Sequence, residues 1–156
     1  MAHDLAASAG TVVLAAERGG VGGGPQGRRA AGVAEILSRS LSSRAVLCDL
    51  FGAQGSVLEH NVSVEVVARY KRASLDRLTT MTALILKYLP ELGENATLFS
   101  LQTMVMAGAL SAYSTPPPSL RAAYQAEPDL ARFHLELADY LKPALTATLL
   151  GVLPRR

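Results

Sequence analysis

The sequence predicts an all-α protein, and three observations lead to that prediction. Hydrophobic residues make up 49% of the chain and charged residues 18%, which is typical of a compact protein rather than a disordered one. From Arg29 onward the apolar residues recur at helical spacing. No convincing stretch of strict alternation, the pattern of a half-buried strand, interrupts them before the end of the chain. At 156 residues, the chain is long enough to bury a single core.

Glycines crowd the segment from Gly19 to Gly27 and divide the chain into two parts. We expect residues 1–28 to form a flexible glycine-rich segment and residues 29–154 to form a helical domain. The apolar run that ends at Ala16 is not expected to be a signal peptide, because Asp4 stands where such a peptide carries positive charge. We therefore expect a cytoplasmic protein, and its excess of arginine over lysine is typical of a GC-rich bacterial genome.

The first two predicted helices each present an apolar face. The first runs near Arg29 to Ser42, and its apolar residues are Val33, Ile36, Leu37 and Leu41. The second spans about Ala45 to Glu59. Gly52 and Gly55 weaken this second helix, and they allow either the close approach of a neighbour or a bend.

The third predicted helix is the longest. Ser63 is expected to cap its start, Glu65 lies in its first turn, and Pro90 ends it. Its apolar stripe includes Val67, Leu75, Leu78, Met81, Ile85 and Leu89. A basic group on the same helix comprises Arg69, Lys71, Arg72 and Arg77. We interpret this group as a solvated face with salt bridges, and a phosphate-binding patch is the alternative.

The fourth predicted helix, near Asn95 to Tyr113, carries no charge. No charged residue occurs from Asn95 to Leu120, which over that length indicates either a buried helix or a membrane span. Polar residues interrupt the segment, and the prolines from Pro116 to Pro118 cut it short of a comfortable span. We expect burial within protein and no contact with a membrane.

Two further helices are expected after the prolines. A short helix lies near Ser119 to Ala126, and a long one runs from Pro128 to about Leu150. Pro143 must kink this last helix or locally break its hydrogen bonds. Its expected inner face consists of Leu130, His134, Leu137, Leu141, Leu145 and Leu149.

Several runs in the body of the chain are those of a known family. LCDLFGAQ extends from Leu47, VLEHNVSVEVV from Val57 and RYKR from Arg69, and LPEL follows from Leu89 before the uncharged helix and the triple proline. Together they resemble the C-terminal regulatory domain of TetR-family (tetracycline-repressor-like) transcriptional regulators. The resemblance covers roughly Ala31 to Leu153.

The resemblance implies a helical bundle that encloses a ligand cavity and forms a homodimer, with the last two long helices of each copy packed into a four-helix bundle. The residues support a dimer independently, because an uncharged helix rich in small residues exposes too much apolar surface for a monomer. The predicted interface residues are Ala107, Gly108, Ala109, Ala112, Leu137, Leu141 and Leu145.

The expected ligand is a small apolar effector. Phe99, Gln102 and Met106 share one face of the fourth helix, and Phe51 and Gln54 share one face of the second, so two such faces can enclose a site. His60 or Gln54 is expected to provide the polar anchor. The predicted ligand-binding residues are therefore Phe51, Gln54, His60, Phe99, Gln102 and Met106.

No catalytic or metal site is expected. The three histidines occur singly, and no Ser-His-acid arrangement is evident. Cys48 stands beside Asp49, whose charge disfavours a thiolate, so we interpret it as a small packed hydrophobe. We expect neither an enzyme nor a cofactor.

DNA recognition is not expected from this chain. Members of the TetR family begin with a helix-turn-helix domain, whereas residues 1–29 have neither its length nor its pattern. The net charge of +2 also provides only weak electrostatic attraction to DNA phosphates. The sequence therefore predicts a ligand-sensing and dimerisation domain of a TetR-family regulator that lacks its DNA-binding head in this chain. The alternative is a truncated TetR-like interaction protein that dimerises but binds no effector.

Overall fold

The computed structural model describes residues 24–53 and 62–154, and the regular secondary structure in these ranges is entirely helical. The α-helices are α2 (Pro25–Ser42), α3 (Ala45–Ala53), α4 (Val64–Tyr88), α5 (Asn95–Ser114), α6 (Pro118–Ala126) and α7 (Leu137–Val152). Two 3₁₀ helices, η2 (Pro90–Leu92) and η3 (Pro128–Phe133), join them. The predicted all-α class is confirmed.

Helix α2 begins at Pro25 and not at the predicted Arg29. Proline suits the first position of a helix, because the N–H group that it lacks has no partner there in any case. Gly27 and Arg28 therefore belong to the helix, and the predicted boundary between residues 28 and 29 falls inside it. The predicted apolar face is confirmed, since all four of its residues are buried.

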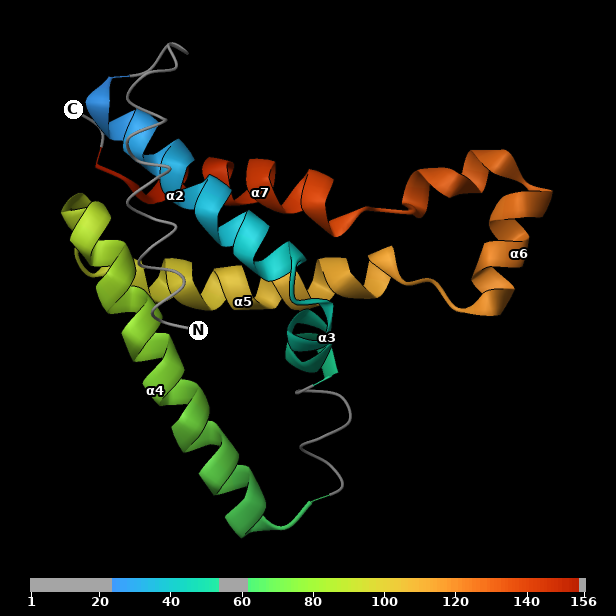
Figure 1. Ribbon diagram of the computed structural model, residues 1–156, viewed down its shortest axis with the longest axis horizontal. Coiled ribbons are helices and arrows are strands. Elements are labelled where there is room, and N and C mark those ends of the chain that lie inside the picture. Colours follow the sequence, from blue (N-terminus) through green and yellow to red (C-terminus); the bar gives the residue numbers. More distant parts are fainter. Residues whose placement is uncertain (1–23, 54–61, 155–156) are drawn as a thin grey trace.

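The core lies between α2, α5 and α7 (Figure 1), where α5 and α7 run antiparallel and α2 packs against α7. Leu141, Leu145 and Leu149 of α7 have no exposed surface, and neither has Phe99 of α5. An ion pair between Lys142 and Glu35 joins α7 to α2. The uncharged helix α5 is thus partly buried against protein, and no helix in the described ranges is long and apolar enough to cross a membrane.

Helix α3 crosses α5 at a contact between two glycines. A Cβ atom added to Gly108 would lie 2.6 Å from the backbone nitrogen of Gly52, and one added to Gly52 would lie 3.0 Å from the carbonyl oxygen of Gly108. About one helical turn further along α5, the Ser111 hydroxyl donates a hydrogen bond of 2.6 Å to the Asp49 carboxylate. The sequence left open whether Gly52 permits a close approach or a bend, and the structure shows a close approach.

Helix α4 is anchored at one end and projects from the body at the other (Figure 1). Ser63 caps its start as predicted, accepting a 3.4 Å hydrogen bond from the Val66 N–H, and the helix ends ahead of Pro90. Ile85 is the one buried residue of α4, whereas Leu75, expected on the inner stripe, is 60% exposed. The first half of α4 is therefore held by few contacts, which leaves space between it and the other helices.

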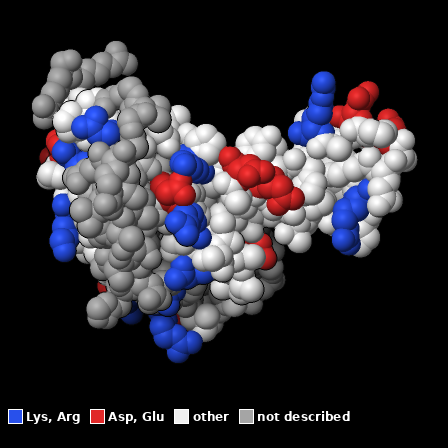
Figure 2. Space-filling model, turned by 45° about the horizontal axis from the view of Figure 1, so that its top comes forward, with Lys and Arg blue, Asp and Glu red and all other residues white. Residues whose placement is uncertain are grey.

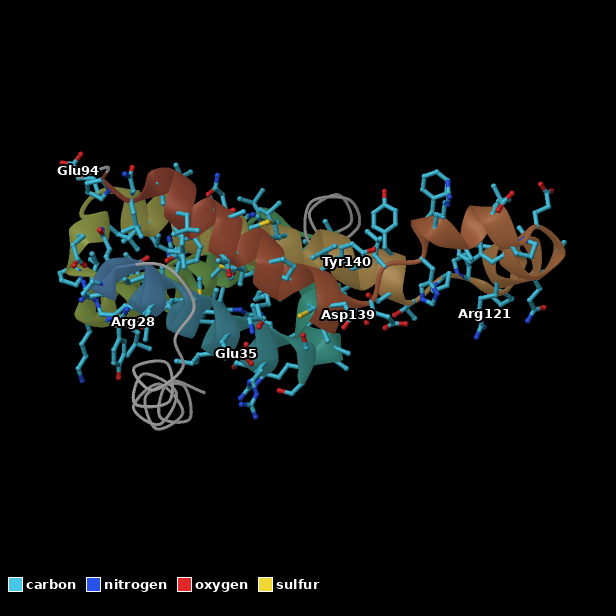
Figure 3. The ribbon with its side chains drawn as sticks, turned by 90° about the horizontal axis from the view of Figure 1, so that it is seen from above. Arg28, Glu35, Glu94, Arg121, Asp139 and Tyr140 are labelled. Atoms are coloured by element: carbon cyan, nitrogen blue, oxygen red, sulfur yellow. The ribbon has the colours of Figure 1, made fainter. Side chains whose placement is uncertain are left out.

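Helices α6 and η3 form an arm that stands away from the body (Figure 2). Neither buries a residue, and Glu94, ahead of α5, and Arg121, on α6, lie at opposite ends of the molecule (Figure 3). The predicted single helix from Pro128 to Leu150 is wrong, because the backbone becomes extended at His134 and α7 begins only at Leu137.

A hydrogen bond from α5 holds this interruption. The Ser114 hydroxyl donates at 2.6 Å to the carbonyl oxygen of Leu135, which lies in the extended segment. Of the predicted inner face, the buried residues are Leu137, Leu141, Leu145 and Leu149, whereas Leu130 is half-buried and His134 exposed on the arm. Helix α7 continues through Pro143, so the break lies ahead of the helix and not at its proline.

Candidate ligand pocket

A pocket of about 480 Å³ lies between α4 on one side and α2, α3 and α5 on the other. Its volume falls within the range of about 300–1,000 Å³ that is usual for small-molecule sites. Its apolar lining residues are Leu37, Leu41, Leu47, Leu50, Phe51, Met81, Leu84 and Met104. Its polar lining residues are Ser40, Arg44, Tyr70, Ser74, Arg77, Thr80 and Thr103.

Helix α4 contributes one continuous face to this pocket. Tyr70, Ser74, Arg77, Met81 and Leu84 follow one another at intervals of three or four residues, which places them on one side of a helix. The face is polar toward the free end of α4 and apolar toward its anchored end. A ligand in the pocket would therefore meet polar groups at one end and apolar groups at the other.

The corner between α2 and α3 contributes Arg44. Its Nη1 donates hydrogen bonds to the carbonyl oxygen of Ser40, at 2.6 Å, and to the Ser40 hydroxyl, at 2.5 Å. These bonds hold the guanidinium against the last turn of α2, where cations are favoured by the exposed carbonyl groups. Arg44 is therefore oriented at the pocket wall before any ligand binds.

A second, smaller pocket adjoins the first at the anchored end of α4. It has a volume of about 30 Å³ and an entirely apolar lining, and it shares Leu37, Met81 and Leu84 with the large pocket. A space of this size holds no more than about one water molecule and is too small for an organic ligand. The large pocket is the better candidate site.

The structure brings one of the predicted ligand-binding residues, Phe51, to this pocket. Phe99 is fully buried in the core, and Met106 packs against the core instead. Gln102 is half-buried, and its Oε1 atom has no hydrogen-bond partner. From the same helix Thr103 and Met104 line the pocket, so a different face of α5 points toward it than the sequence predicted. Gln54 and His60 lie outside the described residues.

Sequence reasoning missed the polar residues that α4 contributes. Arg77 was grouped with the solvated basic face, and its side chain is indeed exposed, but it also lines the pocket together with Tyr70 and Ser74. Their spacing in the sequence could have revealed this, because Tyr70, Ser74 and Arg77 lie on the same side of the helix as Met81 and Leu84. Arg72, from the same basic group, is exposed and does not line the pocket.

Most of the predicted dimer residues lie inside the protomer. Leu137, Leu141 and Leu145 are buried in the core, Ala107 is fully buried, and Gly108 contacts α3. These five therefore cannot meet a second copy while the protomer is folded as described. Ala109 and Ala112 are exposed, as an interface would require.

An exposed apolar stripe runs along the outer sides of α5 and α7. Its members are 47–63% exposed, and those on α5 recur at helical intervals. On α5 they are Leu98, Leu101, Val105 and Tyr113, and on α7 they are Tyr140 and Leu150. Ala109 and Ala112 continue the stripe on α5. It carries no charged residue on α5, because that helix contains none.

The described residues contain no group of three or more potential metal ligands. Cys48 is buried and its thiol lies 3.4 Å from the carbonyl oxygen of Leu41. Burial, and secondarily the charge of Asp49, raises the pKa of this thiol, which keeps it protonated at neutral pH. Its surroundings are those of a packed side chain.

Comparison with known proteins gives one finding. The family model described as tetracyclin repressor-like, C-terminal domain, matches residues 5–156. No curated protein matches the chain significantly. The family match is longer than the stretch from Ala31 to Leu153 over which the sequence motifs showed the resemblance.

Proposed function

Because the chain belongs to the tetracyclin repressor-like C-terminal domain family, we propose that it is the effector-binding and dimerisation domain of a transcriptional regulator. The observation that carries this proposal is the pocket of about 480 Å³ between α4 and the other helices. A regulator that controls transcription in a bacterium acts in the cytoplasm, which is where we place it. We propose no catalytic role.

The pocket has the lining of a small-molecule site. Leucines, methionines and Phe51 provide apolar contact area, while a few polar groups are placed to orient a ligand. The apolar part of such a ligand would gain about 25 cal/mol for each Å² that it removes from water. We propose an effector with a substantial apolar body.

Helix α4 supplies the response to binding in this proposal. Its first half buries no residue, so its position relative to α3 and α5 is set by few contacts. A ligand that touches α4 and the opposite wall at once adds contacts to one arrangement of the helices and favours it. The effector thereby shifts α4 between positions.

The apolar stripe along α5 and α7 supplies the dimer contact in this proposal. Large side chains such as Leu101 and Val105 are about half exposed or more, although α5 has no charged residue to keep that side in water. A two-fold axis between the helix pairs of two copies would bury the stripe against itself. This proposal keeps the predicted pairing of the last two long helices but uses their outer faces.

The pocket is tested with N-phenyl-1-naphthylamine, an uncharged apolar fluorophore whose emission rises on leaving water. We expect saturable binding of one molecule per protomer. Ser74→Trp, which places an indole in the pocket, should abolish binding while circular dichroism stays unchanged. The matched control is Leu75→Trp, because Leu75 is the next residue of α4 but is 60% exposed and lines no part of the pocket.

Absence of saturable binding by the unaltered protein would refute the effector pocket. If the protein then still formed a dimer, the purely interacting protein would be the better assignment. Equal loss of binding in the Ser74→Trp and Leu75→Trp variants would show that the fluorophore binds elsewhere on α4.

A further inference from the structure

The charged groups that line the pocket are all of one sign among the residues the structure describes. Arg44 and Arg77 carry positive charge, and the remaining lining residues are apolar or bear hydroxyl groups. No aspartate or glutamate occurs among the described lining residues. A cationic ligand would meet two like charges there, with no carboxylate from the described lining to offset them.

The carboxylates on the neighbouring helices are engaged or placed elsewhere. Glu35 of α2 pairs with Lys142, and Asp49 of α3 accepts a hydrogen bond from Ser111. Helix α5 has no acidic residue, and Glu65 and Asp76 of α4 are exposed and do not line the pocket. Arg44 and Arg77 both line the pocket, Arg77 with an exposed side chain, and neither forms an ion pair with one of these carboxylates.

Hydroxyl groups line the same parts of the pocket as the two arginines. Tyr70 and Ser74 lie on the same face of α4 as Arg77, and Ser40 lies beside Arg44. Guanidinium and hydroxyl groups all donate hydrogen bonds to anionic oxygens, and charge-assisted bonds are the stronger ones. Leu84 and Met81 lie further along the same face of α4, where an apolar chain can extend.

Resting on the proposed effector pocket, we propose that its ligand is an amphipathic anion, with a carboxylate or phosphate group held by Arg77 and Arg44 and an apolar body against the leucines and methionines. The charge selects the ligand class, and the apolar wall supplies most of the contact area. Uncharged molecules of the same shape bind less tightly, and cationic ones bind least.

Three ligands with the same ten-carbon chain test the proposal. Decanoate, decan-1-ol and decylamine are each titrated against the bound N-phenyl-1-naphthylamine. The two ionic ligands are kept below their micellar concentrations and decan-1-ol below its solubility limit. A charge-assisted hydrogen bond is worth roughly a tenfold change in affinity or more. We therefore expect decanoate to displace the fluorophore at about one tenth of the decanol concentration, with decylamine the weakest.

Single variants locate the effect. Arg77→Gln and Arg44→Gln should each weaken decanoate about tenfold and leave decanol within about twofold. Arg72→Gln is the matched control, because Arg72 is an exposed arginine of α4 that does not line the pocket. Binding of the uncharged fluorophore reports whether each variant keeps its pocket, which matters for Arg44 because it also bonds to Ser40.

The outcomes separate this inference from the proposed function. If the fluorophore does not bind, the effector pocket fails and the inference fails with it. If the fluorophore binds but decanoate is no better than decanol, or if Arg77→Gln weakens both ligands equally, the pocket stands and the anionic ligand is refuted.

Discussion

The crossing of α3 over α5 predicts that Gly108→Ala destabilises the protein, although alanine is the better helix former. The added Cβ would lie 2.6 Å from the Gly52 nitrogen and 2.9 Å from the Phe51 carbonyl carbon. Both are backbone atoms, so no side-chain rotation relieves the contact. Helix α3 must move away from α5, which loosens the packing of Phe51 at the pocket wall.

The size of the effect follows from two opposing contributions. Overpacking of this kind costs about 1–3 kcal/mol, whereas replacing glycine by alanine inside a helix returns about 1 kcal/mol. Because the added Cβ meets backbone atoms, the cost lies in the upper part of that range, at about 2–3 kcal/mol. We therefore expect a net loss of about 1–2 kcal/mol in the free energy of unfolding. For a chain of this size that corresponds to a fall in Tm of about 3–6 °C.

Thermal and urea unfolding followed by circular dichroism measure this change. Gly52→Ala should be milder, since its Cβ meets its nearest atom at 3.0 Å. Gly27→Ala is the control, because no described atom lies within 4 Å of its Cβ, and it should leave stability unchanged or raise it. A Gly108→Ala protein as stable as the Gly27→Ala protein would refute the close crossing.

Three further predictions concern the surface, the cysteine and DNA. Light scattering should give a dimeric mass for the unaltered protein. Val105→Glu should yield a folded monomer, because it places a charge in the apolar stripe, whereas the control Val46→Glu, at an exposed position on α3, should remain dimeric. A dimeric Val105→Glu protein would place the interface elsewhere. The raised pKa of Cys48 and its burial should make its reaction with a disulfide reagent at pH 7 much slower in the native protein than in urea, and equal rates would contradict this. In a gel shift at physiological salt, the chain alone should form no sequence-specific complex with DNA upstream of its own gene, and a complex of nanomolar affinity would show that residues 1–28 have been misread.

Local chemistry made several helix boundaries predictable. Ser63 and Pro90 bound α4 through groups that act within a few residues, and the uncharged α5 ends close to the proline run. The break between η3 and α7 was not predictable in this way. It is held by a hydrogen bond from Ser114, which is far from Leu135 in the sequence.

The orientation of α5 limited the prediction of the site. This helix is apolar on nearly every side, so periodicity does not reveal which face meets the pocket, which meets α3 and which is exposed. Phe99 and Met106 were therefore assigned to the site, and Gly108 to the dimer interface. Arg77 was missed for a related reason, because a polar residue facing a pocket has the same pattern as one facing water.

Methionine methyl resonances give the most direct test of where the effector site lies. Met81 and Met104 line the pocket, whereas Met106 packs against the core on the same helix as Met104. In a protein labelled with carbon-13 at the methionine methyl groups, N-phenyl-1-naphthylamine should shift the resonances of Met81 and Met104 saturably and leave that of Met106 unchanged. A shift of Met106 while Met81 and Met104 stay in place would contradict the pocket between α4 and the other helices.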